Sequence, residues 1–174
     1  MEPAAIDRRR WMLDALDRHE AGLLRFAIRL LGDEDSARDA VQHAFLRLCG
    51  QPAEPLDGRV GPWLFAVCRH YAIDLLRKRE NAPAGESAAA DCCGDSPDPA
   101  DAAERADLYR LLNRLVDQLP VAQREAVSLW SEGFGYREIA EMTETSEGNV
   151  RVMVHRAFKQ LRQHPAVRGL GTRD

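Results

Sequence analysis

Six basic or imidazole side chains follow one another in segment 148–164, which contains no carboxylate. They are Arg151, His155, Arg156, Lys159, Arg162 and His164. The preceding segment, 125–147, holds most of the carboxylates of this part of the chain. The two segments are short and amphipathic, and they meet at a tight turn. An acidic segment followed by a basic one in this arrangement is typical of a helix-turn-helix, whose second helix enters the DNA major groove. The alternative is a solvated basic face on an ordinary helical hairpin.

Helical spacing divides the second of these segments into a core face and an outward face. The residues expected to face the core are Val150, Val154, Ala157 and Leu161. Those expected to face outward are Asn149, Arg151, Val152, His155, Arg156 and Lys159. Ser146 can cap the helix, and the free N–H groups behind it can contact a phosphate. Arginine and asparagine near this end can pair with guanine and adenine edges, so the pattern favours DNA binding.

The bulk composition limits the kind of nucleic-acid binding. The chain has 174 residues, enough for one ordinary domain or two small ones, and its net charge is -4. A protein that coats nucleic acid indiscriminately would be basic overall, so contact with DNA is expected from a local face. No apolar run approaches the roughly 20 residues that span a bilayer, and the N-terminal segment lacks the apolar core of a secretory signal. We therefore expect a cytoplasmic protein without membrane insertion.

The sequence lacks the motifs of hydrolytic and transfer enzymes. It contains no HExxH, no GxSxG and no glycine-rich phosphate loop. Cys49 and Cys68 stand in apolar helical context and are expected to be small buried hydrophobes. Cys92 and Cys93 stand in a polar segment, where a redox or metal role stays open although no CxxC motif or histidine is near. We expect no catalytic residue, no metal site and no cofactor.

A change in composition at 80–107 divides the chain into two modules. This segment is rich in Ala, Pro, Gly, Asp and Glu, and Arg105 is its only base. It is typical of a poorly ordered acidic linker, which turns helical near Ala102. No stretch alternates like a strand, so the predicted fold is all-α, with two small helical domains joined by a flexible linker. The predicted boundaries are 10–79 for the first domain, 80–104 for the linker, 105–164 for the second domain and 165–174 for the tail.

Three helices are expected in the first module. The first is apolar on one broad face and ends at Gly32, and the acidic and hydroxyl residues at 33–36 open the second. After a loop rich in proline and glycine at 50–61, the third opens at Pro62 and ends at Arg79. Its apolar face is expected to hold Trp63, Val67, Tyr71 and Leu75, and to be widened by Leu64, Ile73 and Leu76. The side chains left outward are Arg69, His70, Arg77, Lys78 and Arg79.

Two parts of the sequence resemble one protein family. LPVAQREAVSLW, followed by YREIAEM and SEGNVRVMVHRAFKQLR, closely resembles region 4 of sigma factors, the subunits that give bacterial RNA polymerase its promoter specificity. Upstream, DSARDAVQHAFLRL resembles region 2.2, and PWLFAVCRHYAIDLLRKR resembles the end of region 2, which meets the promoter -10 element. The two resemblances occur in the family's order. The short chain resembles the extracytoplasmic-function (ECF) class, also called group IV.

The resemblance implies an alternative sigma factor rather than an enzyme. Such a factor binds core RNA polymerase, recognises -35 and -10 promoter elements and helps to melt the start region. Its implied partners are promoter DNA, the clamp helices of the largest polymerase subunit, the polymerase flap and an anti-sigma factor. In the family the linker threads the channel that nascent RNA later occupies, which suits its negative charge. A tether that only stays soluble explains that charge equally well.

The resemblance also assigns roles by position. Helix 33–48 would dock on the clamp helices, with the exposed candidates Asp35, Asp39, Gln42 and His43. Loop 56–62 resembles the element that captures an unpaired -10 base, and its polar side chains are Asp57 and Arg59. Phosphates near the melted bases would be held by Arg69, His70, Arg77, Lys78 and Arg79, the last three of which also suit a solvated helix end. The -35 element would be contacted by Ser146, Glu147, Asn149, Arg151, Val152, His155, Arg156 and Lys159.

Three features depart from the family pattern. The turn of the helix-turn-helix commonly contains glycine and here reads Thr143-Glu144-Thr145. A left-handed backbone is unfavourable for glutamate relative to glycine, so the turn could be reshaped. His70 stands where region 2 commonly has asparagine. Ala157 and Phe158 make the last stretch of the recognition helix less basic than usual.

Two other functions fit part of the pattern. A stand-alone helix-turn-helix regulator would need dimer symmetry to fix the spacing of its half-sites, and the first module shows no obvious heptad seam. A helical adaptor without a nucleic-acid role would keep its activity after charge reversal at Arg151 and Arg156.

Overall fold

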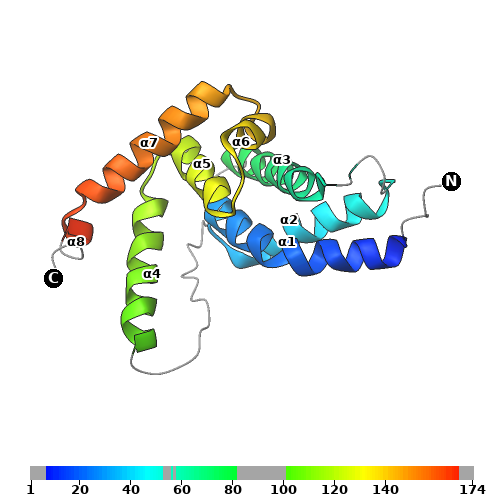
Figure 1. Cartoon of the computed structure of the whole chain (residues 1–174), viewed down its shortest axis with the longest axis horizontal. Coiled ribbons are helices and arrows are strands. Elements are labelled where there is room, and N and C mark those ends of the chain that lie inside the picture. The colour runs from blue at the N-terminus through cyan, green and yellow to red at the C-terminus, as the bar shows by residue number, and fades with distance from the viewer. Residues whose placement is uncertain (1–6, 53–55, 57, 82–100, 169–174) are drawn as a thin grey trace. The chain divides into compact units, whose positions relative to one another are not determined.

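All regular elements in the described part of the chain are helices (Figure 1), which confirms the predicted all-α fold. The computed structural model describes residues 7–52, 56, 58–81 and 101–168. The chain divides into two compact units, one holding the helices before residue 91 together with residues 142–144, and the other holding the rest of the helices after residue 92. Most of the predicted linker, including Cys92 and Cys93, lies outside the described residues.

The first helix, α1 (Arg8–Leu31), has a cap at each end. Asp7 accepts hydrogen bonds from two backbone N–H groups of the first turn, at 3.1 and 3.4 Å. At the other end Gly32 has a φ of 77°, and its N–H donates to the Ile28 carbonyl at 2.8 Å. Glycine adopts this left-handed conformation without the steric cost of a side chain, so the predicted end at Gly32 is confirmed.

The second helix, α2 (Glu34–Cys49), begins as its acidic start predicts. The Asp33 carboxylate accepts a hydrogen bond from the backbone N–H of Ser36 at 2.8 Å. At the other end, the Arg8 guanidinium donates to the carbonyl of Cys49, which links the start of α1 to the end of α2. The buried face of α2 is made largely of small side chains, namely Ala37, Ala40, Val41, Ala44 and Leu48.

The third helix, α3 (Val60–Glu80), begins slightly before the predicted Pro62, which still lies in its first turn. Its buried face also differs from the prediction. The expected core residues are only half-buried, namely Trp63, Val67, Tyr71 and Leu75. The buried residues are Gly61, Leu64, Phe65, Cys68 and Ala72, of which Leu64 alone was predicted to lie on the apolar face. Apolar residues surround much of α3, so spacing alone did not fix its orientation, whereas its small residues allow close approach to α1 and α2.

The second unit contains α4 (Asp101–Asp117), α5 (Val121–Ser131), α6 (Tyr136–Thr143), α7 (Glu147–Gln163) and α8 (Pro165–Arg168). Its core joins the end of α4 to α5 and α7. One core cluster consists of Val116, Leu119, Val127 and Ala157, with Leu161 packed against it. Val150 and Val154 are also buried, so the predicted core face of segment 148–164 is confirmed.

The two cysteines within the described residues differ in environment. Cys68 is buried as predicted, and burial raises the pKa of its thiol to about 12. Cys49 is exposed, which contradicts the prediction, because it follows the buried Leu48 at the end of α2 and lies off the buried face. Among the described helices, none combines the length and apolarity needed to cross a bilayer. The described residues also contain no cluster of three or more histidine, cysteine, aspartate or glutamate side chains placed to hold a metal.

Candidate nucleic-acid interface

A left-handed residue separates α6 from α7. Glu144 has a φ of 55°, and it is the only non-glycine residue with a positive φ in the described chain. Across this turn the Thr145 N–H donates to the Ala140 carbonyl at 3.0 Å, as in a Schellman helix end. The turn is therefore not reshaped. Glu144 adopts the conformation that glycine usually takes there, at the steric cost expected for a residue with a side chain.

The start of α7 is held by side-chain hydrogen bonds. The Ser146 hydroxyl accepts from the backbone N–H of Asn149 at 3.2 Å, which confirms the predicted cap. The Asn149 side chain donates from Nδ2 to Oγ1 of Thr145 at 2.9 Å. These bonds fix the first turn of α7, where backbone N–H groups without helical partners can meet an anion.

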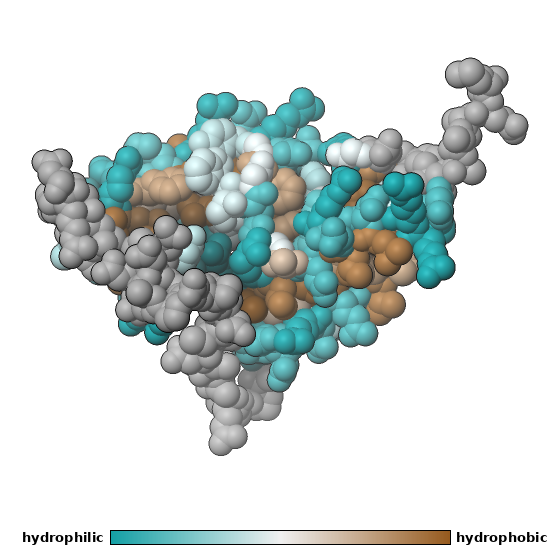
Figure 2. Space-filling model, turned by 60° about the horizontal axis from the view of Figure 1, so that its bottom comes forward, coloured by the Kyte–Doolittle hydropathy of each residue, from teal (hydrophilic) through white to brown (hydrophobic). Residues whose placement is uncertain are grey.

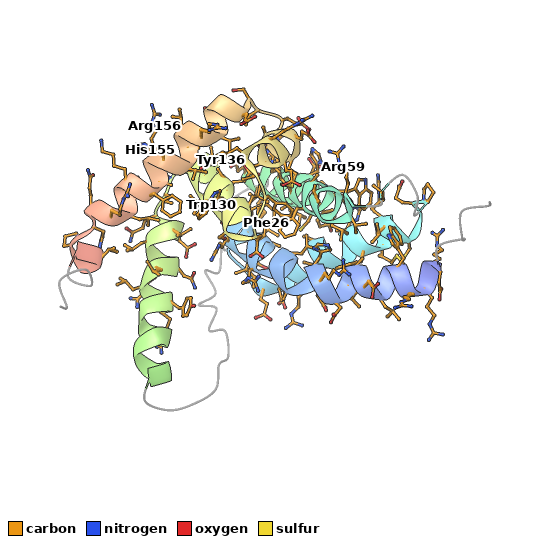
Figure 3. The ribbon with its side chains drawn as sticks, viewed as in Figure 1. Phe26, Arg59, Trp130, Tyr136, His155 and Arg156 are labelled. Atoms are coloured by element: carbon orange, nitrogen blue, oxygen red, sulfur yellow. The ribbon has the colours of Figure 1, made fainter. Side chains whose placement is uncertain are left out.

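Every residue that the resemblance assigns to the -35 element is exposed, including the whole predicted outward face of α7. These residues are Ser146, Glu147, Asn149, Arg151, Val152, His155, Arg156 and Lys159. Figure 3 shows His155 and Arg156 projecting from the outer side of the helix. Glu147 is the one carboxylate among these residues, and beyond it segment 148–164 contains only bases among its charged side chains, which suits contact with a phosphate backbone.

Arg151 has the best defined surroundings of the bases on this face. Its Nη2 lies 2.7 Å from Oε1 of Glu147, one helical turn earlier, and its Nε lies 3.3 Å from the same oxygen. Its guanidinium carbon lies 5.0 Å from the centroid of the Tyr136 ring, over the face of the ring. Tyr136 (labelled in Figure 3) is the first residue of α6, so both helices of the helix-turn-helix contact this arginine.

An aromatic pair between α5 and α7 escaped the sequence analysis. Trp130 is 43% exposed and meets Phe158 edge-on, with ring centroids 5.1 Å apart. Val121, at the start of α5, is also exposed. The signal was a tryptophan at the last turn of an amphipathic helix. Partly exposed tryptophan beside other apolar side chains is typical of protein contact surfaces.

Three of the predicted polymerase-contact residues form a row on α2. Asp35, Asp39 and Gln42 are exposed, and their spacing places them on one face of the helix. Leu46, which was not among the predicted contact residues, continues this row at the same spacing and is 64% exposed. Figure 2 shows brown apolar areas among the teal polar surface on one face of the molecule. A large exposed leucine within a polar row is a candidate anchor for a partner.

His43, the fourth predicted contact residue, lies apart from this row. It is half-buried, and its ring stacks on Tyr71 of α3 with centroids 4.5 Å apart and planes 19° apart. One face of the imidazole is therefore covered within the bundle. His43 joins α2 to α3 and is less available to a partner than Asp39 or Gln42.

The start of α3 presents Arg59, one of the two residues predicted to read a -10 base. Arg59 is exposed (labelled in Figure 3) and follows Gly58, whose φ of 72° bends the chain. Asp57, the other predicted residue, lies outside the described residues. Just beyond Arg59, a side chain at Gly61 would place its Cβ 2.9 Å from Cε1 of His19 in α1. The start of α3 thus packs directly on α1, which fixes the position from which Arg59 projects.

The side chains predicted to hold phosphates along α3 differ in their surroundings. His70, Arg77 and Lys78 are exposed, and Arg69 is half-buried. Arg79 is engaged within the bundle, because it donates to Asp33, to Ser36 and to a backbone carbonyl of α1. Its Nη2 lies 2.8 Å from Oδ2 of Asp33 and also bonds to the Ser36 hydroxyl. Its Nη1 lies 3.3 Å from the carbonyl oxygen of Leu31.

These bonds shift the titration of Asp33. Partial burial acts to raise the pKa of this carboxyl group. Hydrogen bonds from the backbone and side chain of Ser36 and from Arg79, together with the charge of Arg79, outweigh that effect and lower the pKa below its ordinary value. The Asp33 carboxylate therefore both caps α2 and links the ends of three helices.

Comparison with known proteins agrees with this architecture. The family description "Sigma-70 region 2" matches residues 15–82, and "Sigma-70, region 4" matches residues 109–161. The chain is 32% identical over 153 residues to the ECF RNA polymerase sigma factor SigL of Mycobacterium tuberculosis, a match that covers 84% of each protein. It is 29% identical over 154 residues to the ECF sigma factor SigE of Mycolicibacterium smegmatis, covering 85% of this chain and 59% of SigE.

A solved structure has the same fold. It is the sigma factor RpoE of Bartonella quintana in complex with the anti-sigma factor NepR, matched with a TM-score of 0.62 and 23% identity over 90% of this chain and 95% of that chain. With the sequence matches, these findings show that the chain belongs to the family of ECF RNA polymerase sigma factors. It spans little more than half of the length of some relatives, 59% of SigE and 52% of the probable sigma factor SigI.

Proposed function

We propose that this chain is an alternative sigma factor that binds core RNA polymerase and directs it to promoters through their -35 and -10 elements. The observation that carries the proposal is the exposed basic face of α7, which lies within the segment that matches region 4. The same chain also contains a unit that matches region 2. The chain supplies recognition and has no catalytic reaction of its own. It acts in the cytoplasm, where the polymerase works, and needs no cofactor.

In the second unit, α7 enters the major groove of the -35 element. The capped start of α7 contacts a phosphate through its backbone N–H groups, which positions the helix without reading sequence. Bases are read by the exposed side chains that follow, among which Arg151 and Arg156 suit guanine and Asn149 suits adenine. Lys159, farther along the helix, contacts the backbone. This arrangement is supported by the exposure of the whole face and by the bonds that fix its first turn.

In the first unit, the loop before α3 captures an unpaired base of the -10 element through Arg59 and Asp57. Arg69, His70, Arg77 and Lys78 hold the nearby phosphates. We assign Arg79 a smaller part in DNA binding, because its guanidinium would first have to leave Asp33 and the Leu31 carbonyl. Its main role is to hold the bundle together.

The row on α2 docks on the clamp helices of the polymerase. Asp35, Asp39 and Gln42 supply the polar contacts, and we add Leu46 as the apolar anchor because it is 64% exposed within that row. In the second unit, Trp130 offers an apolar contact to the polymerase flap. An anti-sigma factor restrains the chain; the matched structure of RpoE with NepR supports a partner of this kind.

Binding to core polymerase provides the test of this docking surface. The labelled full chain is titrated with core polymerase, and Leu46→Glu is compared with Leu13→Glu, a matched change at an exposed leucine of α1. Loss of a hot-spot residue should weaken binding about tenfold or more for Leu46→Glu only. Equal binding by both variants would remove α2 from the interface. Dimeric binding to duplex DNA without polymerase would favour a stand-alone regulator instead.

A further inference from the structure

The contacts of Arg151 hold its side chain in one place, although a flexible arginine could also bind DNA. An arginine side chain has many rotamers, and fixing it costs conformational entropy when a complex forms. Here the guanidinium is already held by Glu147 from its own helix and by Tyr136 from α6. Tyr136 is half-buried, which limits the freedom of its ring. The arginine is thus placed before DNA arrives, at a point set by both helices.

The geometry leaves the useful end of the guanidinium available. Glu147 accepts from Nε and Nη2, on one edge of the planar group. An arginine carries five N–H donors, so the end formed by Nη1 and Nη2 can still donate to two acceptors. The side chain of Arg151 is 62% exposed. A paired donor set of this kind matches O6 and N7 of guanine, the commonest specific contact in the major groove.

The charge of Glu147 also favours a base over a phosphate. The Glu147 carboxylate, 2.7 Å from the guanidinium, offsets part of its charge and repels a nearby phosphate. Guanine presents neutral acceptors and suffers less from this repulsion. Glu147 therefore acts against capture of Arg151 by the DNA backbone.

We propose that Tyr136, Glu147 and Arg151 form one base-reading unit, in which Tyr136 is a positioning residue that fixes Arg151 for a guanine of the -35 element. The proposal rests on the proposed function of α7 and assigns to α6 a part in specificity. Arg151 contacts the base, whereas Tyr136 acts through Arg151.

The experiment measures base preference rather than activity alone. Reconstituted polymerase with the full chain transcribes a promoter library randomised at -35, and the position read by Arg151 is the one whose preference disappears in Arg151→Ala. Tyr136→Leu removes the aromatic ring, and Tyr136→Phe is the matched control that keeps it. We expect Tyr136→Leu to lower the guanine preference at that position about two- to fivefold, the range for an exposed cation–π contact, and Tyr136→Phe to leave it unchanged.

A double-mutant comparison separates positioning from a general defect. In the Arg151→Ala background, Tyr136→Leu should change the base preference no further. A uniform loss of transcription across the library without a change of preference would overturn the proposal. So would a change of preference at the same position in the Arg151→Ala background.

Failure of the proposed function gives a different result. If the wild-type chain directs polymerase to no shared promoter elements, the proposed function fails. The same variants are then compared in a second experiment, in which the full chain alone selects sequences from random duplex DNA. A selected guanine that is lost in Tyr136→Leu and kept in Tyr136→Phe still supports the base-reading unit. Selection of no sequence would overturn it.

Discussion

Arg79 links the end of α3 to the junction of α1 and α2, and its replacement by alanine should destabilise the first unit. The change removes the contact between Nη2 and Oδ2 of Asp33 at 2.8 Å, the bond to Ser36 and the 3.3 Å bond from Nη1 to the Leu31 carbonyl. The side chain of Asp33 is 23% exposed and that of Arg79 is 46% exposed. Solvent therefore partly screens the ion pair, and its contribution to stability should be close to that of a surface ion pair.

The two kinds of contact give the expected magnitude. An exposed ion pair contributes about 0.2–1 kcal/mol. A hydrogen bond to a backbone carbonyl contributes about 0.5–1.5 kcal/mol. We therefore expect Arg79→Ala to lower the free energy of unfolding of the first unit by about 1–2 kcal/mol. Asp33→Ala should cost more, because it also removes the cap of α2, worth about 1 kcal/mol.

Tryptophan fluorescence during urea unfolding can measure this loss in the full chain. Trp11 and Trp63 report on the first unit, and a Trp130→Phe background removes the signal of the second. Lys78→Ala is the matched control, because Lys78 is an exposed base in the same helical turn. The reasoning is refuted if Arg79→Ala is no more destabilising than Lys78→Ala, or if it costs as much in the Asp33→Ala background as in the wild type.

Three further predictions concern the turn, pH and the start of α3. Glu144→Gly should raise the unfolding temperature of the chain by a few degrees, because it relieves the left-handed backbone at this position. Glu144→Ala keeps that strain and should not raise it, and an equal rise in both variants, measured by circular dichroism, would contradict this prediction. Because the folded-state pKa of Asp33 is lowered from 3.8, its stabilisation is complete above pH 4 or so and is lost as pH falls through the folded-state pKa; acid unfolding of Asp33→Asn should lack that part of the pH dependence. Burial, with the charge of Arg18, lowers the pKa of His19 from 6.5; Gly61→Ala should displace the ring toward water, and an NMR titration should then show the pKa returning toward 6.5, whereas an unchanged value would refute the close contact.

Much of the fold follows from local sequence signals. Gly32 ends α1, Asp33 caps α2 and Ser146 caps α7, each because a particular side chain or its absence satisfies the backbone at a helix end. The core face of α7 also agrees with its spacing, since Val150, Val154 and Ala157 recur at helical spacing and are buried. The prediction for α3 was wrong where the helix is apolar on several sides. There the packing of small residues against α1 and α2 decided which side is buried, and that depends on the neighbours.

The candidate site was predictable to a similar degree. Exposure along α7 followed from periodicity, but the partners of its side chains did not. The stacking of His43 on Tyr71, the engagement of Arg79 with Asp33 and the contact of Arg151 with Tyr136 depend on tertiary structure. Leu46 could have been found by extending the spacing of Asp39 and Gln42 by one turn.

Transcription by reconstituted polymerase tests the central claim most directly. The purified chain is mixed with core polymerase and a genomic promoter library, and new transcript starts are sequenced for the wild type and for an Arg151→Glu/Arg156→Glu variant. The account predicts starts that share -35 and -10 elements with the wild type and their loss with the variant, while binding to core polymerase is retained. Starts that persist in the variant, or a chain that binds core polymerase but directs it to no shared elements, would contradict the account.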